Sequence, residues 1–87
     1  MFSVPSSITV ADANSALKAG LAAIAAGTTQ FDFAQLATLD SAAVATMLAW
    51  QRAAHSKNLT LEFVHLPANL QSLLQMYGVD ELLPSVA

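Results

Sequence analysis

The chain has no cysteine and only three glycines, and both shortages exclude particular kinds of site. Without cysteine there is no disulfide, no thiolate metal ligand and no thiol nucleophile. The three glycines are spread along the chain, so they do not form a glycine-rich loop that cradles phosphate. Basic residues are equally scarce. Lys18, Arg52 and Lys57 are too few to neutralise a phosphate backbone, so we expect no nucleic-acid partner.

Charge is low and apolar content is high. Charged side chains make up 10% of the residues with a net charge of -3, whereas 55% are hydrophobic. A surface so poor in charge favours cover by a partner or by a second copy. The first residues show no basic stretch followed by an apolar run, so we expect no signal peptide. The most hydrophobic helical stretch, residues 16–26, is too short to cross a bilayer. These features predict a cytoplasmic domain.

Two apolar periodicities alternate along the chain, which predicts a single α/β domain over residues 1–87. Thr9 and Asp12 have the spacing of a capping box before the first helix, and Gly27 and Asn58 follow the first two helices. The expected strands cover residues 2–4, 28–33 and 59–65, and the expected helices cover 13–26, 41–56 and 67–77. Residues 34–39 are expected to be a connection, and residues 79–83 a last turn. Strands separated by helices pair in parallel, so we expect a mostly parallel sheet of about three to four strands with helices packed against it.

Side chains that catalyse reactions or bind metals are few and scattered. His55 and His65 stand at the expected end of a helix and of a strand, and neither has a second ligand at a helical or short-loop spacing. The carboxylates are dispersed except for Asp80 and Glu81, which suit a cap of the last turn. We therefore predict no catalytic residue, no metal site and no cofactor. A small enzyme is the alternative, and only a measured turnover would support it.

The Asp40-Ser41 turn is the best candidate for a binding site. It lies where the second expected strand leads into the second expected helix, and in an open parallel sheet functional groups gather at the carboxyl ends of strands. Backbone N–H groups at a helix start have no intrahelical partner, so a hydroxyl or carboxylate there either caps them or is shared with a partner. The alternative is that Asp40 or Ser41 is an ordinary N-cap.

The second expected helix has two unlike faces when it is projected at about 100° per residue. The core-facing residues are Val44, Met47, Leu48 and Ala54, with Trp50 at the edge of the stripe. The opposite face consists of Ala45, Thr46, Ala49, Arg52, Ala53 and Ser56. This face is small and almost uncharged, which lets another backbone approach, and Arg52 is the cation that would fix the register with an acidic group. The alternative is a solvent-facing alanine helix selected for helix propensity.

The residues from Leu39 to Leu48 resemble the signature of STAS domains, a family that includes anti-sigma-factor antagonists and related domains in transporters. The family pattern is an apolar residue, Asp, Ser or Thr, a small residue, usually Gly, and then an aliphatic helix; here Ala43 replaces the Gly. The resemblance covers nearly the whole chain. The segment from Tyr77 to Pro84 is similar to the end of the short STAS subunits of Mla-type phospholipid-trafficking ABC transporters. The resemblance implies a small STAS-like α/β fold.

The resemblance also implies a non-enzymatic module that binds and regulates the ATPase of a lipid-transport ABC complex. By position, Asp40 would brace the turn and Ser41 would touch the ATPase. The implied docking surface consists of Thr38, Asp40, Ser41, Ala42, Ala45, Ala49 and Arg52. Contact with the inner membrane would then be indirect, through the transporter.

The alternative within the same family is an anti-sigma-factor antagonist that a kinase binds and phosphorylates. Phospho-switching members carry their acceptor serine two places after the Asp, and this chain has Ala42 there, which has no hydroxyl to accept phosphate. The substitution favours the transporter role over the phosphate switch.

Overall fold

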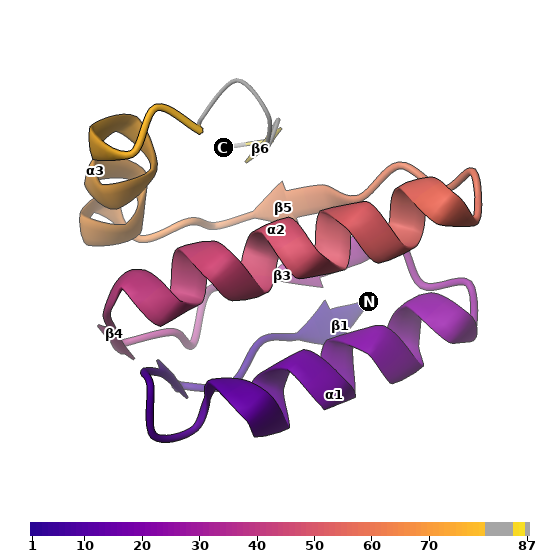
Figure 1. Ribbon diagram of the computed structural model, residues 1–87, viewed down its shortest axis with the longest axis horizontal. Coiled ribbons are helices and arrows are strands. Elements are labelled where there is room, and N and C mark those ends of the chain that lie inside the picture. Colours follow the sequence, from indigo (N-terminus) through magenta and orange to yellow (C-terminus); the bar gives the residue numbers. More distant parts are fainter. Residues whose placement is uncertain (80–84, 87) are drawn as a thin grey trace.

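The computed structural model describes residues 1–79 and the backbone of residues 85–86. In chain order the elements are β1 (Phe2–Ser3), β2 (Ser7–Ile8), α1 (Ala13–Ala25), β3 (Gln30–Asp32), β4 (Thr38–Leu39), α2 (Ser41–Ser56), β5 (Glu62–Val64), α3 (Ala68–Met76) and β6 (Ser85–Val86). Helices α1 and α2 run side by side in the same direction, in front of the sheet, and α3 lies at the end of the molecule where α2 begins (Figure 1). The predicted α/β class is confirmed.

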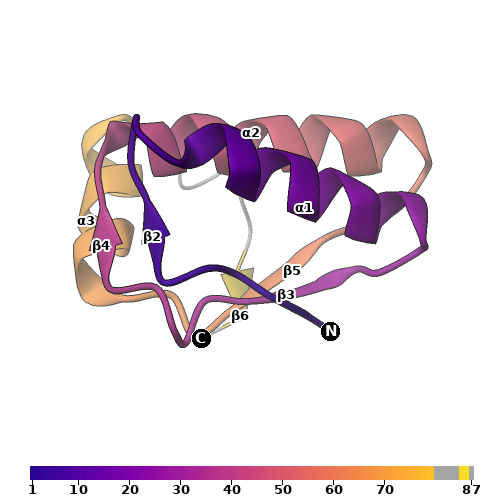
Figure 2. The same cartoon turned by 90° about the horizontal axis from the view of Figure 1, so that it is seen from below.

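Four strands form an all-parallel sheet in the order β1-β3-β5-β6. Its central row is aromatic, because Phe2 is paired with Phe31 and Phe31 with Phe63. Strands β2 and β4 pair in parallel with each other as a separate two-stranded sheet at the end where α2 begins (Figure 2). The predicted parallel sheet of three to four strands is therefore confirmed, and the two-stranded sheet is an addition to it.

The helices of residues 1–79 cover one face of the four-stranded sheet. Figure 2 shows α1 and α2 over one face and no helix across the other. Side chains alternate along a strand, so Phe31 and Phe63 point toward the helices, whereas Gln30 and Glu62 point away. Gln30 Nε2 donates a hydrogen bond to Glu62 Oε1 across the two strands at 3.3 Å. Parallel sheets are usually buried on both faces. Here Gln30, Asp32 and Glu62 at outward positions allow part of one face to contact water, although Val64 on the same face is buried.

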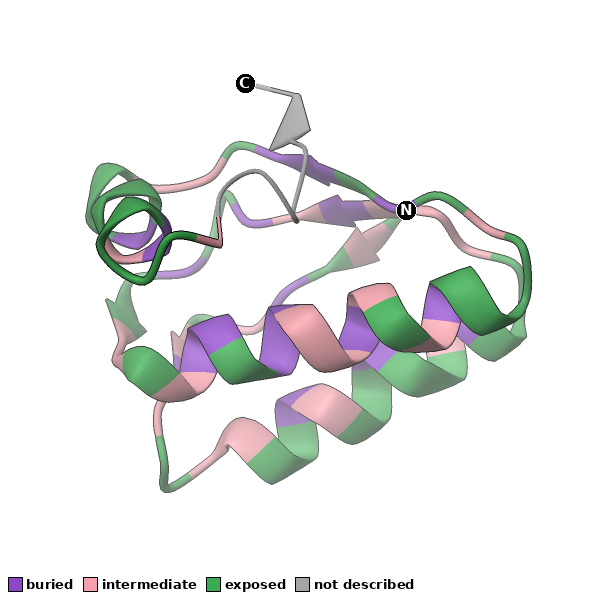
Figure 3. Cartoon of the chain, turned by 45° about the horizontal axis from the view of Figure 1, so that its top comes forward, coloured by how far each residue is buried: buried purple, intermediate pink, exposed green. Residues whose placement is uncertain are grey.

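Trp50 lies inside the core and is 0% exposed. Its ring centroid is 5.0 Å from that of Phe31 and 6.4 Å from that of Phe33, and its indole Nε1 donates to the backbone oxygen of Leu17 at 3.1 Å. Figure 3 shows the buried residues along the inward sides of α1, α2 and the strands. The prediction that Trp50 lies at the edge of the apolar stripe is wrong, because α1 packs against this flank of α2 and Gly20 leaves room there for the indole.

The same packing buries Thr46, which was predicted on the outward face of α2. Thr46 is 4% exposed, and its hydroxyl donates to the backbone oxygen of Ala42 at 2.7 Å. The hydroxyl is thus satisfied inside its own helix, so the residue tolerates burial under α1. The rest of the predicted outward face divides into exposed Ala45, Arg52 and Ser56 and partly buried Ala49 and Ala53.

The ends of the first two helices follow from local chemistry. Helix α2 has the predicted bounds, with Asp40 as its N-cap and Asn58 in a left-handed conformation at φ 60 after its end. Helix α1 begins at Ala13, after a turn in which the Asp12 carboxylate accepts from the Thr9 amide at 2.6 Å. That bond joins the two residues of the predicted capping box, but Thr9 is not the N-cap: the N-cap of α1 is Asp12, so the bond closes the turn before the helix and does not cap it. The Thr9 hydroxyl accepts from the amide two residues further on, not three.

Four other predictions need correction or fall outside the structure. Strands β3 and β5 are shorter than the predicted 28–33 and 59–65, because alternating side chains indicate strand character but not where the neighbouring backbone stops pairing. The predicted connection 34–39 contains β4, a strand that exists only through its pairing with β2. The third helix is shorter than the predicted 67–77, and Tyr77, its predicted last residue, is 52% exposed just beyond the end of α3. The predicted last turn lies from residue 80 onward outside the described residues.

The helices of the described residues are short for a membrane protein. None of them is long and apolar enough to span a bilayer.

Candidate functional site

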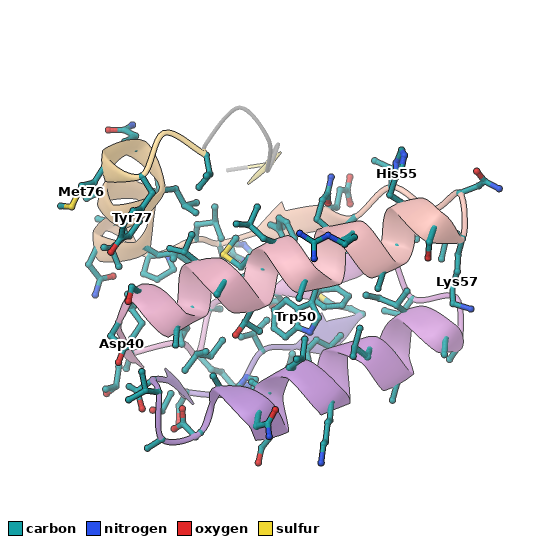
Figure 4. All side chains as sticks on the ribbon, in the orientation of Figure 1. Asp40, Trp50, His55, Lys57, Met76 and Tyr77 are labelled. Carbon is teal, nitrogen blue, oxygen red and sulfur yellow. The ribbon has the colours of Figure 1, made fainter. Side chains whose placement is uncertain are left out.

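Asp40 braces the turn that leads into α2. Its Oδ1 accepts from the Ala42 amide at 2.8 Å, and its Oδ2 accepts from the Val10 amide at 3.2 Å. The first bond caps α2, and the second joins this helix start to the loop between β2 and α1, 30 residues away in the sequence. Figure 4 shows Asp40 at the end of the molecule where α2 begins. The predicted bracing role of Asp40 thus has two hydrogen bonds to support it.

Ser41 is the first residue of α2, and its side chain is exposed. The N-cap of the helix is Asp40, so the hydroxyl of Ser41 is not needed to cap it. Within residues 1–79, no hydrogen bond of the structure involves the Ser41 hydroxyl. The alternative of an ordinary N-cap therefore applies to Asp40 and not to Ser41. The Ser41 hydroxyl can donate a hydrogen bond to another molecule and accept one from it.

A shallow groove of about 220 Å³ runs between α1 and the first half of α2. Its lining residues are small or apolar apart from one amide and one hydroxyl: Ala13, Asn14, Leu17, Ala42, Ala45, Thr46 and Ala49. Three of the predicted docking residues, Ala42, Ala45 and Ala49, therefore line one surface. The groove exists because alanine side chains leave the space between two adjacent helices unfilled.

A second, larger groove of about 440 Å³ lies on the other side of α2. It is lined by Ser41, Val44, Ala45, Leu48, Tyr77 and Val79, so it joins the start of α2 to the turn after α3. Ala45 lines both grooves and forms the low ridge between them. The Ser41 hydroxyl thus stands beside an apolar channel whose far wall is Tyr77.

The two remaining predicted residues lie apart from the grooves. Thr38 is an exposed residue of β4, and its backbone amide donates to the oxygen of Ser6 at 3.0 Å. Arg52 is exposed on α2, well beyond the turn, and makes no ion pair within residues 1–79. The structure therefore brings together Ser41, Ala42, Ala45 and Ala49 around the turn, with Thr38 before it and Arg52 further along the helix.

The loop between β2 and α1 is held rigidly next to this turn. The Ser7 side chain and then the Thr9 amide, as hydrogen-bond donors, hold the pKa of Asp12 below its usual value. The Asp12 carboxylate accepts from the Thr9 amide and so closes the turn that contains Val10, which is 82% exposed. Sequence reasoning did not single out Val10, since the bond from its amide to Asp40 is a long-range contact that no local pattern indicates.

The ion pair of the described residues lies at the ends of two neighbouring strands. His65 Nδ1 is 3.0 Å from Asp32 Oδ1, which also accepts from the Ala34 amide at 2.9 Å. The Ala34 amide and then His65 hold the pKa of Asp32 below its usual value. His55, in the last turn of α2, is exposed (Figure 4). The residues of the described part offer no group of three or more His, Asp or Glu side chains that would hold a metal ion.

These features define a small parallel α/β domain with a braced turn between two apolar grooves. A family model described as "Mlab, STAS domain" matches residues 3–84. The chain therefore belongs to the STAS-domain family, in its MlaB-like branch. Membership supports a binding or regulatory domain and not a catalyst. No curated protein matches the sequence.

Proposed function

We propose that this STAS domain docks on the ATPase subunit of an Mla-type lipid-transport ABC transporter and regulates it. The observation that carries the proposal is the Ser41 hydroxyl, which is exposed at the first position of α2 on a turn that Asp40 holds from two sides. A turn braced in this way is already ordered before binding, so little conformational entropy is lost when a partner contacts it. The MlaB-like family of the chain supports the choice of partner.

The surface beside Ser41 suits close contact with another protein. Ala42, Ala45 and Ala49 have the smallest side chains that a helix former offers, so a partner backbone can approach α2 closely. The uncharged grooves on both sides lose little hydration when they are covered. Arg52, one turn beyond Ala49, offers a cation for an acidic group of the partner. In this role the domain is cytoplasmic and reaches the inner membrane only through the transporter.

The test is co-purification with the cognate ABC ATPase. Ser41→Arg puts a long charged side chain on the contact, and we expect it to weaken binding at least about tenfold. The unfolding temperature should change little, since the Ser41 hydroxyl makes no hydrogen bond within the described residues. Ser56→Arg is the matched control, because Ser56 is exposed at the other end of the same helix, about four turns away. Unchanged binding of Ser41→Arg would contradict the docking site.

The exposed Ser41 hydroxyl also bears on the second candidate, an anti-sigma-factor antagonist controlled by a kinase. Ala42 occupies the usual acceptor place and its amide donates to Asp40, so phosphate transfer would have to use Ser41. Incubation with a cognate kinase and ATP, followed by mass spectrometry, tests this role. A phosphate on Ser41 would favour partner switching over the transporter role.

A further inference from the structure

Several large apolar side chains are exposed to solvent at the end of the molecule that carries the Ser41 turn. Val10 is 82% exposed, Met76 74% and Tyr77 52%. Figure 4 shows Met76 and Tyr77 at the same end as Asp40, and the amide of Val10 is bonded to Asp40 itself. Apolar side chains grouped in water in this way mark an interaction surface more often than isolated ones do.

Val10 is tied to the turn next to Ser41 by hydrogen bonds. Its amide donates to Asp40, while the turn that contains it is closed by the bond from the Thr9 amide to Asp12. Two carboxylates thus restrain the backbone at Val10, whose side chain is exposed. A fixed apolar side chain of this kind contributes to binding without first having to be ordered.

Tyr77 lines the larger groove together with Ser41. Its amide donates to the Leu73 oxygen at 3.0 Å, which fixes the backbone at the end of α3. Its ring forms a wall of the 440 Å³ groove whose opposite wall is α2. An aromatic ring with a polar tip is well suited to an interface, since the ring excludes water and the hydroxyl stays hydrated. The groove has room for an apolar side chain from outside.

Charge restricts the kind of partner. The described residues at this end include two carboxylates, Asp12 and Asp40, each at a helix start. The cations Lys18, Arg52 and Lys57 lie further along α1 and α2, the last at the opposite end (Figure 4). A complementary surface is therefore apolar with basic residues at its border.

We propose that Val10, Ser41 and Tyr77 form one composite docking surface, with Met76 at its margin. The surface receives an apolar segment with basic flanks from the ATPase subunit. One nonpolar side chain of that segment enters the groove between α2 and Tyr77, and a polar group meets the Ser41 hydroxyl. This inference rests on the proposed function and widens its site beyond the residues of the family signature.

Binding of three surface variants to the cognate ATPase tests the composite surface. Val10→Ser and Tyr77→Ser each remove apolar contact area, and we expect each to raise Kd about 5- to 20-fold. Tyr77→Phe keeps the ring and should bind within about twofold of the wild type. Leu21→Ser is the matched control, because Leu21 is 37% exposed on α1 and lines neither groove; its Kd should not change. Equal unfolding temperatures verify that all the variants are folded.

The outcomes separate this inference from the proposed function. If Ser41→Arg abolishes binding while Val10→Ser and Tyr77→Ser bind normally, the ATPase role stands and the composite surface is wrong. If none of the three weakens binding, both proposals are wrong. If Leu21→Ser weakens binding as much as Val10→Ser, apolar exposure in general is responsible and the composite surface is again wrong.

Discussion

Gly20 of α1 lies directly against the indole ring of Trp50 of α2. A Cβ added at position 20 would collide with Nε1 and two ring carbons of that indole. The same nitrogen donates to the Leu17 oxygen, so the tryptophan is both packed and hydrogen-bonded against one stretch of α1. This contact fixes how α1 lies on α2, and thereby the shape of the groove between them.

Replacement of Gly20 should therefore destabilise the domain. Gly→Ala inside a helix ordinarily stabilises by roughly 0.5–1 kcal/mol. For Gly20→Ala we expect the opposite sign, a loss of about 1–3 kcal/mol in the free energy of unfolding, because a methyl group is forced into a filled core. Urea unfolding measures it. Gly27→Ala is the control: its φ is +88 but nothing lies within 4 Å of the added Cβ, so only backbone strain acts. A Gly20→Ala variant more stable than the wild type would contradict the packing.

The environment of Trp50 can be read directly, because it is the single tryptophan of the chain. A fully buried indole should emit at short wavelength and resist quenching by iodide or acrylamide. Its emission should shift to the red only in the main unfolding transition. An indole at the edge of the core, as the helical projection predicted, would be quenched in the folded state. Steady-state fluorescence with a quencher titration distinguishes the two positions.

Features that depend on neighbouring residues in the sequence were predicted correctly, whereas features that depend on the packing of distant elements were not. Helix α2 has its predicted bounds because Asp40 and Asn58 act through bonds and backbone angles within a few residues of themselves. The positions of Trp50 and Thr46 were misjudged because they depend on where α1 packs, which a projection of α2 alone does not contain. Strand β4 was missed for the same reason, since its two residues need β2 as a partner.

The sequence predicts the Asp40-Ser41 turn of the candidate site but not the residues that lie around it. The Asp40-Ser41 turn follows from a strand that leads into a capped helix, and the structure assigns the cap to Asp40. Val10 and Tyr77 come to that turn from distant parts of the chain through the fold. Tyr77 belongs to the predicted helix 67–77, and the helical pattern does not indicate that α3 ends one residue earlier and leaves Tyr77 exposed.

Substitution of Asp40 should separate its two hydrogen bonds. Asparagine caps helices as well as aspartate does, so Asp40→Asn should keep the bond from Ala42. Its second atom is an NH₂ group, which does not accept from the Val10 amide. We expect faster hydrogen exchange at Val10 with little loss of stability, whereas Asp40→Ala should lose about 0.5–2 kcal/mol as well. Unchanged Val10 exchange in Asp40→Asn would contradict the bridge between the loop and α2.

Acid should destabilise the domain through Asp12 and Asp32. The Ser7 side chain and the Thr9 amide lower the pKa of Asp12, and the Ala34 amide and His65 lower that of Asp32. A carboxyl with a lowered folded pKa binds fewer protons when folded, so its contribution is present above the unfolded pKa of about 3.9 and is lost as pH falls through the folded pKa.

The urea midpoint should therefore decrease as pH is lowered below about 4, and less steeply in Asp32→Asn than in the wild type. Added salt should reduce the share of this pH dependence that comes from the interaction of Asp32 with His65, because both side chains are near the surface. A midpoint that is constant down to about pH 2 would contradict the lowered pKa values.

A probe attached to the face of the sheet opposite α1 and α2 can report on the domain while it is bound to a partner. Glu62 is exposed on β5, and because side chains alternate along a strand it points to the opposite side from buried Phe63, away from α1 and α2. Because the chain has no cysteine, Glu62→Cys would provide a single attachment point for a fluorophore or spin label. A probe placed there reports on the tumbling and stoichiometry of a complex without occupying the surface through which the complex forms.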